Sequence, residues 1–231
     1  MDDGTGAARV APPTSEAALI GRATALAGLS LGELAQRAGM ALPGAPRHAK
    51  GYAGMLLECL LGADAGSRPS PDFSALGIEL KSIPVDAAGQ PVESTFLCVA
   101  PVRGAGGLRF EDSPVWRKLA RVLWIPVEAA SSLPLAQRRI GWPLLWSPDA
   151  ADVAVLRQDW EELMEVLLTG EIETLDARLG RYLQVRPKAA NARALTASHD
   201  ASGAPAATLP RGFYLRTRFT RRVLAGARSS A

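Results

Sequence analysis

The sequence predicts an α/β protein with a central mixed β-sheet flanked by helices. Three observations support this class. The N-terminal part has helical spacing of apolar residues, the middle changes to short apolar or alternating runs bounded by Pro and Gly, and residues 152–179 return to helical spacing. With 231 residues, 48% of them hydrophobic, the chain can bury one sizeable core or two small lobes. We expect one compact unit with two lobes.

The first two helices are predicted from their N-terminal caps. Residues 1–14 are rich in Gly, Ala and Pro, and we expect them to form a disordered extension. Ser15 then starts the apolar-periodic stretch SEAALIGRATALAG, which predicts a helix. Ser30 and Glu33 match a capping box, in which each side chain satisfies a free backbone N–H, ahead of a second helix.

The third predicted helix is the strongly apolar stretch YAGMLLECLLG, which follows a Pro/Gly-containing loop and ends near Gly62. Glu58 is the only carboxylate inside it. A charge is costly to bury unless it is paired or holds a cation, so we expect Glu58 to be more than a solvated residue.

The strands are predicted by four runs in the middle of the chain: GIELKSIPV, STFLCVAPV, RVLWIPVE and WPLLW. Residues 152–179 follow as an amphipathic helix whose acidic face we expect to be solvated. Residues 198–208, SHDASGAPAAT, have the composition of a flexible loop.

Cysteine and histidine usage excludes a Cys/His zinc site. Cys59 and Cys98 lie in separate apolar runs without a CxxC motif, and His48 and His199 are the only histidines. Buried free thiols fit a reducing compartment. The chain has no apolar run of about 18 residues and no basic-then-apolar signal pattern at its start, so we expect a soluble cytoplasmic protein without a membrane partner.

The charge of the chain is unevenly distributed. From Arg186 to the end, nine lysines and arginines stand against one acidic residue, Asp200, a net charge of +8 that leaves −5 for residues 1–185. Such polarity lets one part of the molecule attract a polyanion such as nucleic acid. A basic tail without such a partner is the alternative that charge alone leaves open.

The most informative stretch is PDFSALGIELK, which contains Asp72, Glu79 and Lys81. It predicts a turn, a bend at Gly77 and then a strand on which Glu79 and Lys81 share one face. If the turn brings Asp72 to the same place, two carboxylates and an ammonium could hold Mg²⁺ and set a water beside a phosphate. The alternative is a turn-forming aspartate followed by an ordinary exposed ion pair on a strand.

A set of longer blocks resembles the MutH family, in family order over roughly residues 15–220. The blocks are residues 50–85, TFLCVAP, RVLWIPVE, PLAQRRIGWPLLWSP, DWEELME, YLQVRPKAANA and LPRGFYL. The resemblance implies a restriction-endonuclease-like fold of the PD-(D/E)xK class, with two arms forming a DNA cleft. It implies Mg²⁺-dependent nicking of the unmethylated strand at hemimethylated GATC sites in double-stranded DNA, stimulated by a MutL-type mismatch repair protein. We expect a monomer.

The resemblance also assigns the chemistry to named residues. Asp72 and Glu79 match the metal-binding carboxylates of the family, and Lys81 matches the lysine of its motif. Glu58 matches the accessory acid, a possible third metal ligand, and Lys118 the supporting base.

The DNA-reading residues are expected mainly in the basic part of the chain. Arg186 resembles the family's base-reading arginine, and Lys188 beside it would contact phosphate. Tyr214 matches the residue that senses the methyl group on the target adenine, which a rigid ring could do sterically. Lys50 and Arg211 complete the expected DNA contacts. From the residues alone, Arg186 and Lys188 could be a solvated edge and Tyr214 a core residue.

The resemblance divides the chain into residues 1–14, an endonuclease core over 15–185, and a basic DNA-reading arm and tail over 186–231. The tail RRVLAGARSSA lacks the apolar end expected in the family. Two other functions fit the same residues. A restriction-type endonuclease would cut both strands as a dimer without a repair partner, and a non-catalytic DNA-binding repair component would commonly lose at least one residue of the Asp72, Glu79 and Lys81 set.

Overall fold

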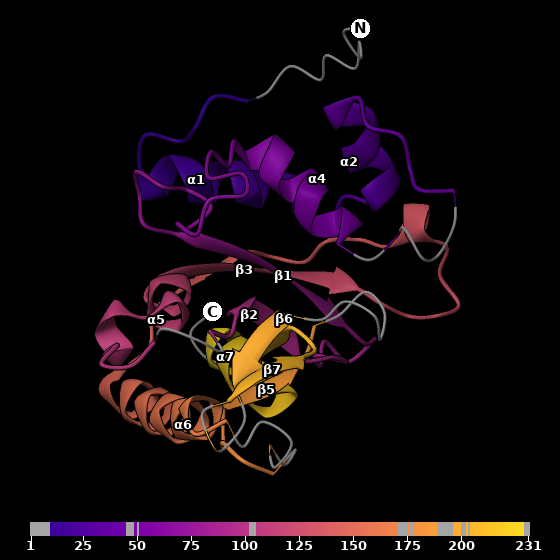
Figure 1. Cartoon of the computed structure of the whole chain (residues 1–231). Coiled ribbons are helices and arrows are strands. Elements are labelled where there is room, and N and C mark those ends of the chain that lie inside the picture. The colour runs from indigo at the N-terminus through magenta and orange to yellow at the C-terminus, as the bar shows by residue number, and fades with distance from the viewer. Residues whose placement is uncertain are drawn as a thin grey trace, which may run out of the picture. The chain divides into compact units, whose positions relative to one another are not determined.

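The computed structural model describes residues 10–44, 49, 51–101, 105–170, 175, 178–188, 196–199, 202 and 204–228. The chain forms two compact units (Figure 1). Unit 1 contains residues 1–92 and 120–147, and unit 2 contains residues 93–119 and 148–231. Each unit is built from two separate segments of the chain, and the boundaries differ from the predicted division between residues 185 and 186, which lies within a strand. Across the described ranges, no helix is long and apolar enough to span a membrane.

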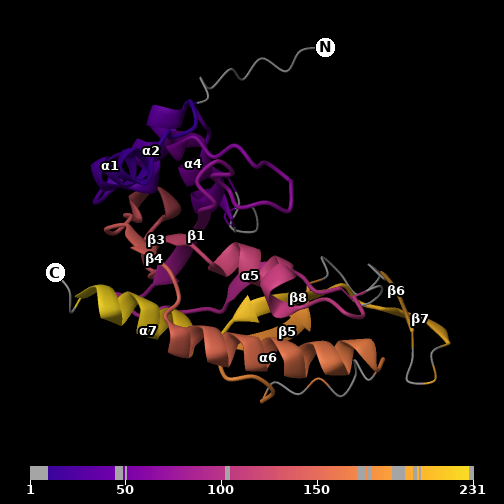
Figure 2. The same cartoon turned by 90° about the vertical axis from the view of Figure 1, so that its left-hand side faces the viewer.

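Unit 1 contains a mixed sheet, as predicted. Its strand order is β1-β3-β4, with β1 and β3 parallel and β3 and β4 antiparallel. Three helices pack on one face of this sheet (Figures 1 and 2). The elements are α1 (Glu16–Leu26), α2 (Leu31–Ala38), α4 (Tyr52–Leu61), β1 (Glu79–Val85), β3 (Val122–Glu128), the short 3₁₀ helix η2 (Leu135–Gln137) and β4 (Leu144–Trp146).

The caps of these helices are confirmed. Ser15 accepts a hydrogen bond from the backbone N–H of Ala18, and Ser30 and Glu33 form the complete capping box of α2. Gly62 ends α4 at a φ of 81°, a left-handed conformation that favours glycine. A side chain on Gly62 would also collide with the backbone of Ala11, because its Cβ would lie 2.5 Å from that carbonyl oxygen.

The expectation of disorder for residues 1–14 is wrong for its described part, residues 10–14. Arg22 of α1 donates hydrogen bonds to the carbonyl oxygens of Ala11, at 2.6 Å, and Leu61, at 3.1 Å. Pro12 is buried. Residues 10–14 are therefore held by hydrogen bonding to Arg22 of α1, and the absence of a side chain at Gly62 leaves room for them. The composition of these residues reveals neither feature. Residues 1–9 lie outside the described residues.

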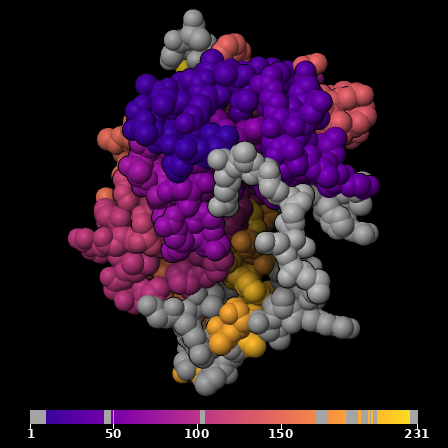
Figure 3. Space-filling view, turned by 90° about the horizontal axis from the view of Figure 1, so that it is seen from above, coloured from indigo at the N-terminus to yellow at the C-terminus, as the bar shows by residue number. Residues whose placement is uncertain are grey.

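The core of unit 1 lies between the helices and one face of the sheet. Fully buried leucines from the helices meet residues of that face of the sheet. The leucines are Leu19, Leu31, Leu34, Leu56, Leu57 and Leu61, and the sheet residues include Leu80, Leu123 and Ile125. Seen from above, the N-terminal helices form one closely packed surface (Figure 3, indigo to violet). Burial of this apolar face is the main stabilising contribution to the unit.

Unit 2 contains a second, antiparallel sheet of order β2-β8-β5, with α6 lying along it (Figure 2). The run STFLCVAPV therefore does not join the sheet of β1 but pairs with a strand near the C-terminus. The elements are β2 (Thr95–Val99), the 3₁₀ helix η1 (Phe110–Asp112), α5 (Pro114–Leu119), α6 (Ala150–Leu168), β5 (Leu183–Pro187), β6 (Thr196–His199), β7 (Pro205–Thr208), β8 (Arg211–Leu215) and α7 (Thr217–Arg228).

Two predictions for unit 2 are wrong. The flexible loop expected over residues 198–208 contains most of an antiparallel hairpin, because β6 and β7 pair in register from Thr196–Thr208 to His199–Pro205. The helix expected over residues 152–179 ends at Leu168, followed by Thr169 and by Gly170 at a φ of 76°. A left-handed glycine directly after the last turn ends a helix.

The acidic face of α6 is only partly solvated. Glu161 and Glu165 are exposed, but Asp152 and Asp159 are 3% and 4% exposed. Asp152 forms an ion pair with Arg222 of α7. Asp159 accepts hydrogen bonds from the backbone N–H groups of residues 181, 182 and 183, at 2.7, 2.5 and 2.8 Å. Burial of both carboxylates is thus compensated by partners that lie far away in the sequence.

Candidate functional site

A tight turn carries Asp72 to the start of β1. The backbones of Phe73 and Ile78 exchange two hydrogen bonds, at 2.9 and 3.3 Å, and Gly77 takes the left-handed conformation with a φ of 65° that closes the turn. The bend predicted at Gly77 is therefore present. It folds the chain back so that the residue before Phe73 lies beside the strand that follows Ile78.

Asp72 lies at the open edge of β1. Its Oδ2 accepts a hydrogen bond of 2.8 Å from the backbone N–H of Leu80. The N–H of Glu79 bonds to the carbonyl oxygen of Arg121 on the β3 side, so the next N–H, that of Leu80, points away from β3. The carboxylate of Asp72 thus binds the peptide that joins Glu79 and Leu80.

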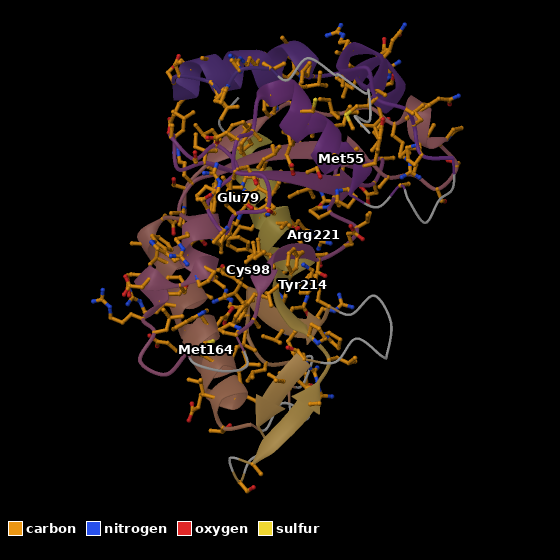
Figure 4. All side chains as sticks on the ribbon, turned by 45° about the horizontal axis from the view of Figure 1, so that its top comes forward. Met55, Glu79, Cys98, Met164, Tyr214 and Arg221 are labelled. Atoms are coloured by element: carbon orange, nitrogen blue, oxygen red, sulfur yellow. The ribbon has the colours of Figure 1, made fainter. Side chains whose placement is uncertain are left out.

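Glu79 and Lys81 form a buried pair on one face of β1. The Nζ of Lys81 lies 2.5 Å from Oε1 of Glu79, and the two side chains are 15% and 2% exposed. Ile78 and Leu80 belong to the core on the opposite face, which confirms the predicted alternation. Figure 4 labels Glu79 on its strand.

The burial of this pair argues against an ordinary exposed ion pair. Removing a carboxylate and an ammonium from water costs several kcal/mol for each ion, roughly, and their attraction compensates for this only in part. A pair of apolar side chains would fill the same place at less cost. Glu79 and Lys81 are therefore better explained by chemistry than by stability.

The donors at this place fit a magnesium ion. Asp72 and Glu79 offer hard carboxylate oxygens. Larger groups, of three or more His, Cys, Asp or Glu side chains suited to a metal, do not occur in the part of the chain that the structure describes. Mg²⁺ usually keeps several waters and binds through one or two carboxylates together with phosphate oxygens. Two carboxylates at the edge of a sheet match that requirement.

Asp64 fixes the turn that carries Asp72. Its backbone N–H donates to the carbonyl oxygen of Asp72 at 2.9 Å, and its carboxylate accepts from Oγ and N of Ser74 at 2.5 and 2.8 Å. These hydrogen bonds, first that of the Ser74 hydroxyl and then that of its backbone N–H, hold the pKa of Asp64 below its ordinary value.

Asp64→Asn is expected to destabilise the protein near neutral pH, with a difference from wild type that shrinks in acid. The lowered pKa means that the ionised carboxylate stabilises the fold above the ordinary aspartate pKa of about 4, and that this contribution is lost as the pH falls through the lowered value. Urea unfolding of both proteins from pH 7 to about pH 2, a range that extends well below the ordinary aspartate pKa, measures it. A difference that is the same at every pH would contradict this explanation, and Glu161→Gln, which changes an exposed acid, is the control.

The remaining described catalytic candidates, Glu58 and Lys118, lie on helices. Glu58 is exposed on the last turn of α4, so burial in an apolar helix, the reason for singling it out, does not hold. Leu56 and Leu57 beside it are fully buried, whereas Glu58 is exposed. Lys118 lies in unit 2, half-buried on the last turn of α5. Lys50 lies outside the described residues.

Arg186, Lys188 and Tyr214 come together on one face of the sheet of unit 2. The guanidinium carbon of Arg186 lies 5.8 Å from the ring centroid of Tyr214, and the Nζ of Lys188 lies 3.6 Å from that of Phe96. Phe96 and Tyr214 meet edge to face, with centroids 5.3 Å apart. We call Phe96, Arg186, Lys188 and Tyr214 the aromatic-basic cluster.

The aromatic-basic cluster is accessible to a partner. Arg186 and Lys188 are exposed, whereas Phe96 and Tyr214 are half-buried, so Tyr214 is not a core residue. Desolvation by its neighbours raises the pKa of Tyr214, which keeps its hydroxyl protonated at neutral pH. Figure 4 labels Tyr214 on β8 and Cys98 on the neighbouring β2. Arg211, also predicted to bind DNA, begins β8 opposite Pro187 and is half-buried.

Sequence reasoning missed several residues around both places. Asp64 is separated from Asp72 by a loop whose fold the sequence does not reveal, and Phe96 was counted only as part of an apolar strand. Ser94, which accepts a hydrogen bond of 2.9 Å from Nη1 of Arg186, carries no signal in the sequence because the two residues meet only in the folded sheet.

Comparison with known proteins identifies the family of the chain. A family model described as DNA mismatch repair enzyme MutH matches residues 61–159, which include Asp72, Glu79 and Lys81. DNA mismatch repair protein MutH of Yersinia enterocolitica is 56% identical over 215 residues, covering 93% of this chain and 94% of the relative. That of Escherichia coli is 55% identical over 216 residues, 94% of each chain. That of Vibrio parahaemolyticus is 56% identical over 212 residues, 92% of this chain and 94% of the relative. The predicted resemblance is thereby confirmed, and the chain belongs to the MutH family of DNA mismatch repair enzymes.

Proposed function

We propose that this protein is a Mg²⁺-dependent DNA endonuclease that nicks the unmethylated strand at hemimethylated GATC sites during mismatch repair. The observation that carries the proposal is the buried Glu79–Lys81 pair with the carboxylate of Asp72 bound one peptide away. Membership of a mismatch repair family supports double-stranded DNA as the substrate of this chemistry.

Asp72 and Glu79 would hold the metal, with Glu58 as an accessory acid. A bound Mg²⁺ would stabilise the charge that builds on the phosphoryl oxygens. Lys81 is held in place by Glu79 at 2.5 Å, so its ammonium is ready to orient the attacking water and to balance the negative charge of the phosphate. Lys118 would support this charge balance.

The aromatic-basic cluster would read the target site. The fork of N–H groups on Arg186 suits a base edge in the major groove, and Lys188 suits a phosphate. The ring of Tyr214 is braced by Phe96 and would meet the methyl group of a modified adenine as a rigid wall. Lys50 and Arg211 would add contacts to DNA.

The proposal includes a setting and a partner. The protein would act in the cytoplasm as a monomer and be stimulated by a MutL-type mismatch repair protein. Several cationic contacts with phosphates would make its DNA binding weaken steeply with added salt.

The test is nicking of hemimethylated GATC duplex in Mg²⁺, with and without ATP-loaded MutL, by wild type and Asp72→Ala. We expect one nick, in the unmethylated strand, by wild type only, faster with MutL. We expect no cleavage of a fully methylated duplex. Absence of nicking by wild type in both conditions would contradict the proposal. Cutting of both strands without MutL would instead support a restriction-type enzyme, which we would expect to be a dimer.

A further inference from the structure

Arg186 spans the sheet of unit 2. It starts on β5, its guanidinium passes over the ring of Tyr214 on the central strand β8, and its Nη1 donates a 2.9 Å hydrogen bond to Oγ of Ser94, the residue before β2. The guanidinium therefore contacts Tyr214 on the central strand and Ser94 beside β2, although the side chain of Arg186 is exposed.

Such contacts matter because an exposed arginine has many rotamers. Bidentate reading of a base edge requires the planar fork in one orientation, and a side chain that is already held there loses less conformational entropy on binding. A guanidinium has five N–H donors. Ser94 uses one of them, so enough remain for two parallel hydrogen bonds to a base.

We infer that Ser94 is a specificity-positioning residue, whose hydroxyl holds the Arg186 guanidinium over Tyr214 in the orientation that reads the target base. This inference rests on the proposed function of Arg186. In this arrangement Ser94 does not contact the base, and it affects base reading only by holding Arg186.

Both ends of the Ser94–Arg186 hydrogen bond are fixed by the same central strand. Thr95, next to Ser94, is buried and pairs with Leu215 of β8. Arg186 pairs with Gly212 of β8 from the other side. Since the two flanking strands share one central strand, the distance between the hydroxyl and the guanidinium is set by the sheet register.

Gly212 keeps the surface beneath the two rings open. A Cβ at this position would lie 2.9 Å from Cε2 of Phe96 and 3.2 Å from Cε2 of Tyr214, so the rings could not keep their places. The position of the Tyr214 ring thus depends on the absence of a side chain at Gly212 and on the edge-to-face contact with Phe96. A guanidinium that lies over a ring can still rotate in its own plane, and the hydrogen bond to Ser94 restricts this rotation.

The decisive comparison is Ser94→Thr against Ser94→Val, two side chains of the same shape that differ in the hydroxyl. Nicking rates are measured on hemimethylated GATC duplex and on duplexes with one base pair of the site replaced. We expect Ser94→Thr to keep the wild-type preference for GATC, and Ser94→Val to reduce it about tenfold, the order expected for a hydrogen bond to a charged group. Thermal unfolding midpoints of both variants should stay alike.

A matched control is Ser147→Ala in unit 1. Its hydroxyl also accepts a hydrogen bond from an arginine, Arg121, at 3.3 Å, but outside the aromatic-basic cluster. We expect no change in site preference. In an Arg186→Lys background, Ser94→Val should have no further effect on preference, because the guanidinium through which Ser94 acts has been removed.

The outcomes separate the two proposals. Equal preference for GATC in Ser94→Thr and Ser94→Val, with preference lost in Arg186→Lys, would overturn the role of Ser94 and leave the proposed function intact. Undiminished preference in Arg186→Lys would overturn the reading role of Arg186 and, with it, that of Ser94. An effect of Ser94→Val that persists in the Arg186→Lys background would also overturn the role of Ser94.

Discussion

Replacing Glu79 by glutamine is expected to slow Mg²⁺-dependent nicking by about 10²–10³-fold or more, the order found when a group that stabilises transition-state charge is removed. Glutamine keeps the size of the side chain and an oxygen for Lys81, but it removes the negative charge that would hold the metal. Single-turnover nicking of hemimethylated GATC duplex, with DNA bound to saturation, measures the chemical step apart from binding.

Two measurements keep this result specific to Glu79. DNA affinity should change little, because the aromatic-basic cluster does not include this residue. Glu161→Gln, which changes an exposed acid on α6, should nick at the wild-type rate. If Glu79→Gln nicked within a few-fold of wild type while folded, Glu79 would not be a metal ligand and the buried pair would need another explanation.

Asp159→Ala is expected to lower the free energy of unfolding by about 3–5 kcal/mol. The substitution leaves the three backbone N–H groups of residues 181–183 without their acceptor, and each buried group that loses its partner costs about 1–3 kcal/mol before water or local movement relieves it. Urea unfolding at neutral pH measures the change. Because β5 starts at Leu183, weaker DNA binding through Arg186 should accompany the loss.

A graded series tests whether the hydrogen bonds of Asp159 are responsible. Asp159→Asn keeps one acceptor oxygen and should cost less than Asp159→Ala. Glu162→Ala removes a carboxylate from the same helix that accepts a hydrogen bond from the exposed side chain of Gln158, and should change stability by no more than about 0.5 kcal/mol. Equal losses for Asp159→Ala and Glu162→Ala would contradict the role of the three N–H groups.

The features that the sequence predicted well are those determined by neighbouring residues. Ser15, Ser30 and Gly62 cap helices through groups no more than four residues away, so their roles can be read from the chain itself. The alternation that sets Glu79 and Lys81 on one face follows from strand geometry alone. For the same reason, the turn at Gly77 was predictable from PDFSALG.

The features that the sequence did not predict depend on partners that lie far along the chain. The run containing Phe96 was expected in the same sheet as β1, but its partner is β8, more than 100 residues later. Asp152 and Asp159 look like solvated acids in a helical pattern and are buried because Arg222 and the 181–183 backbone satisfy them. No local pattern encodes such pairings.

The candidate site divides in the same way. Asp72, Glu79 and Lys81 were accessible to sequence reasoning because one turn and one strand contain all three. The environment of Arg186 was not, since Ser94, Tyr214 and Gly212 reach it only through the order of three strands. Glu58 shows the opposite limit: an apolar stretch predicted burial, yet the face of the helix decides exposure.

The hydrogen bond between Asp72 and Leu80 has a consequence beyond the chemistry of the site. In its sheet, β1 has β3 on one side only, and on the other side residues 91 and 92 pair only with its C-terminal end. An open strand edge is a template for pairing with another copy of the chain. Asp72 occupies the N–H of Leu80 and places a negative charge there, while Pro84, further along the strand, has no N–H to offer. The carboxylate proposed to bind the metal would thus also block pairing with another copy of the chain at this part of the edge.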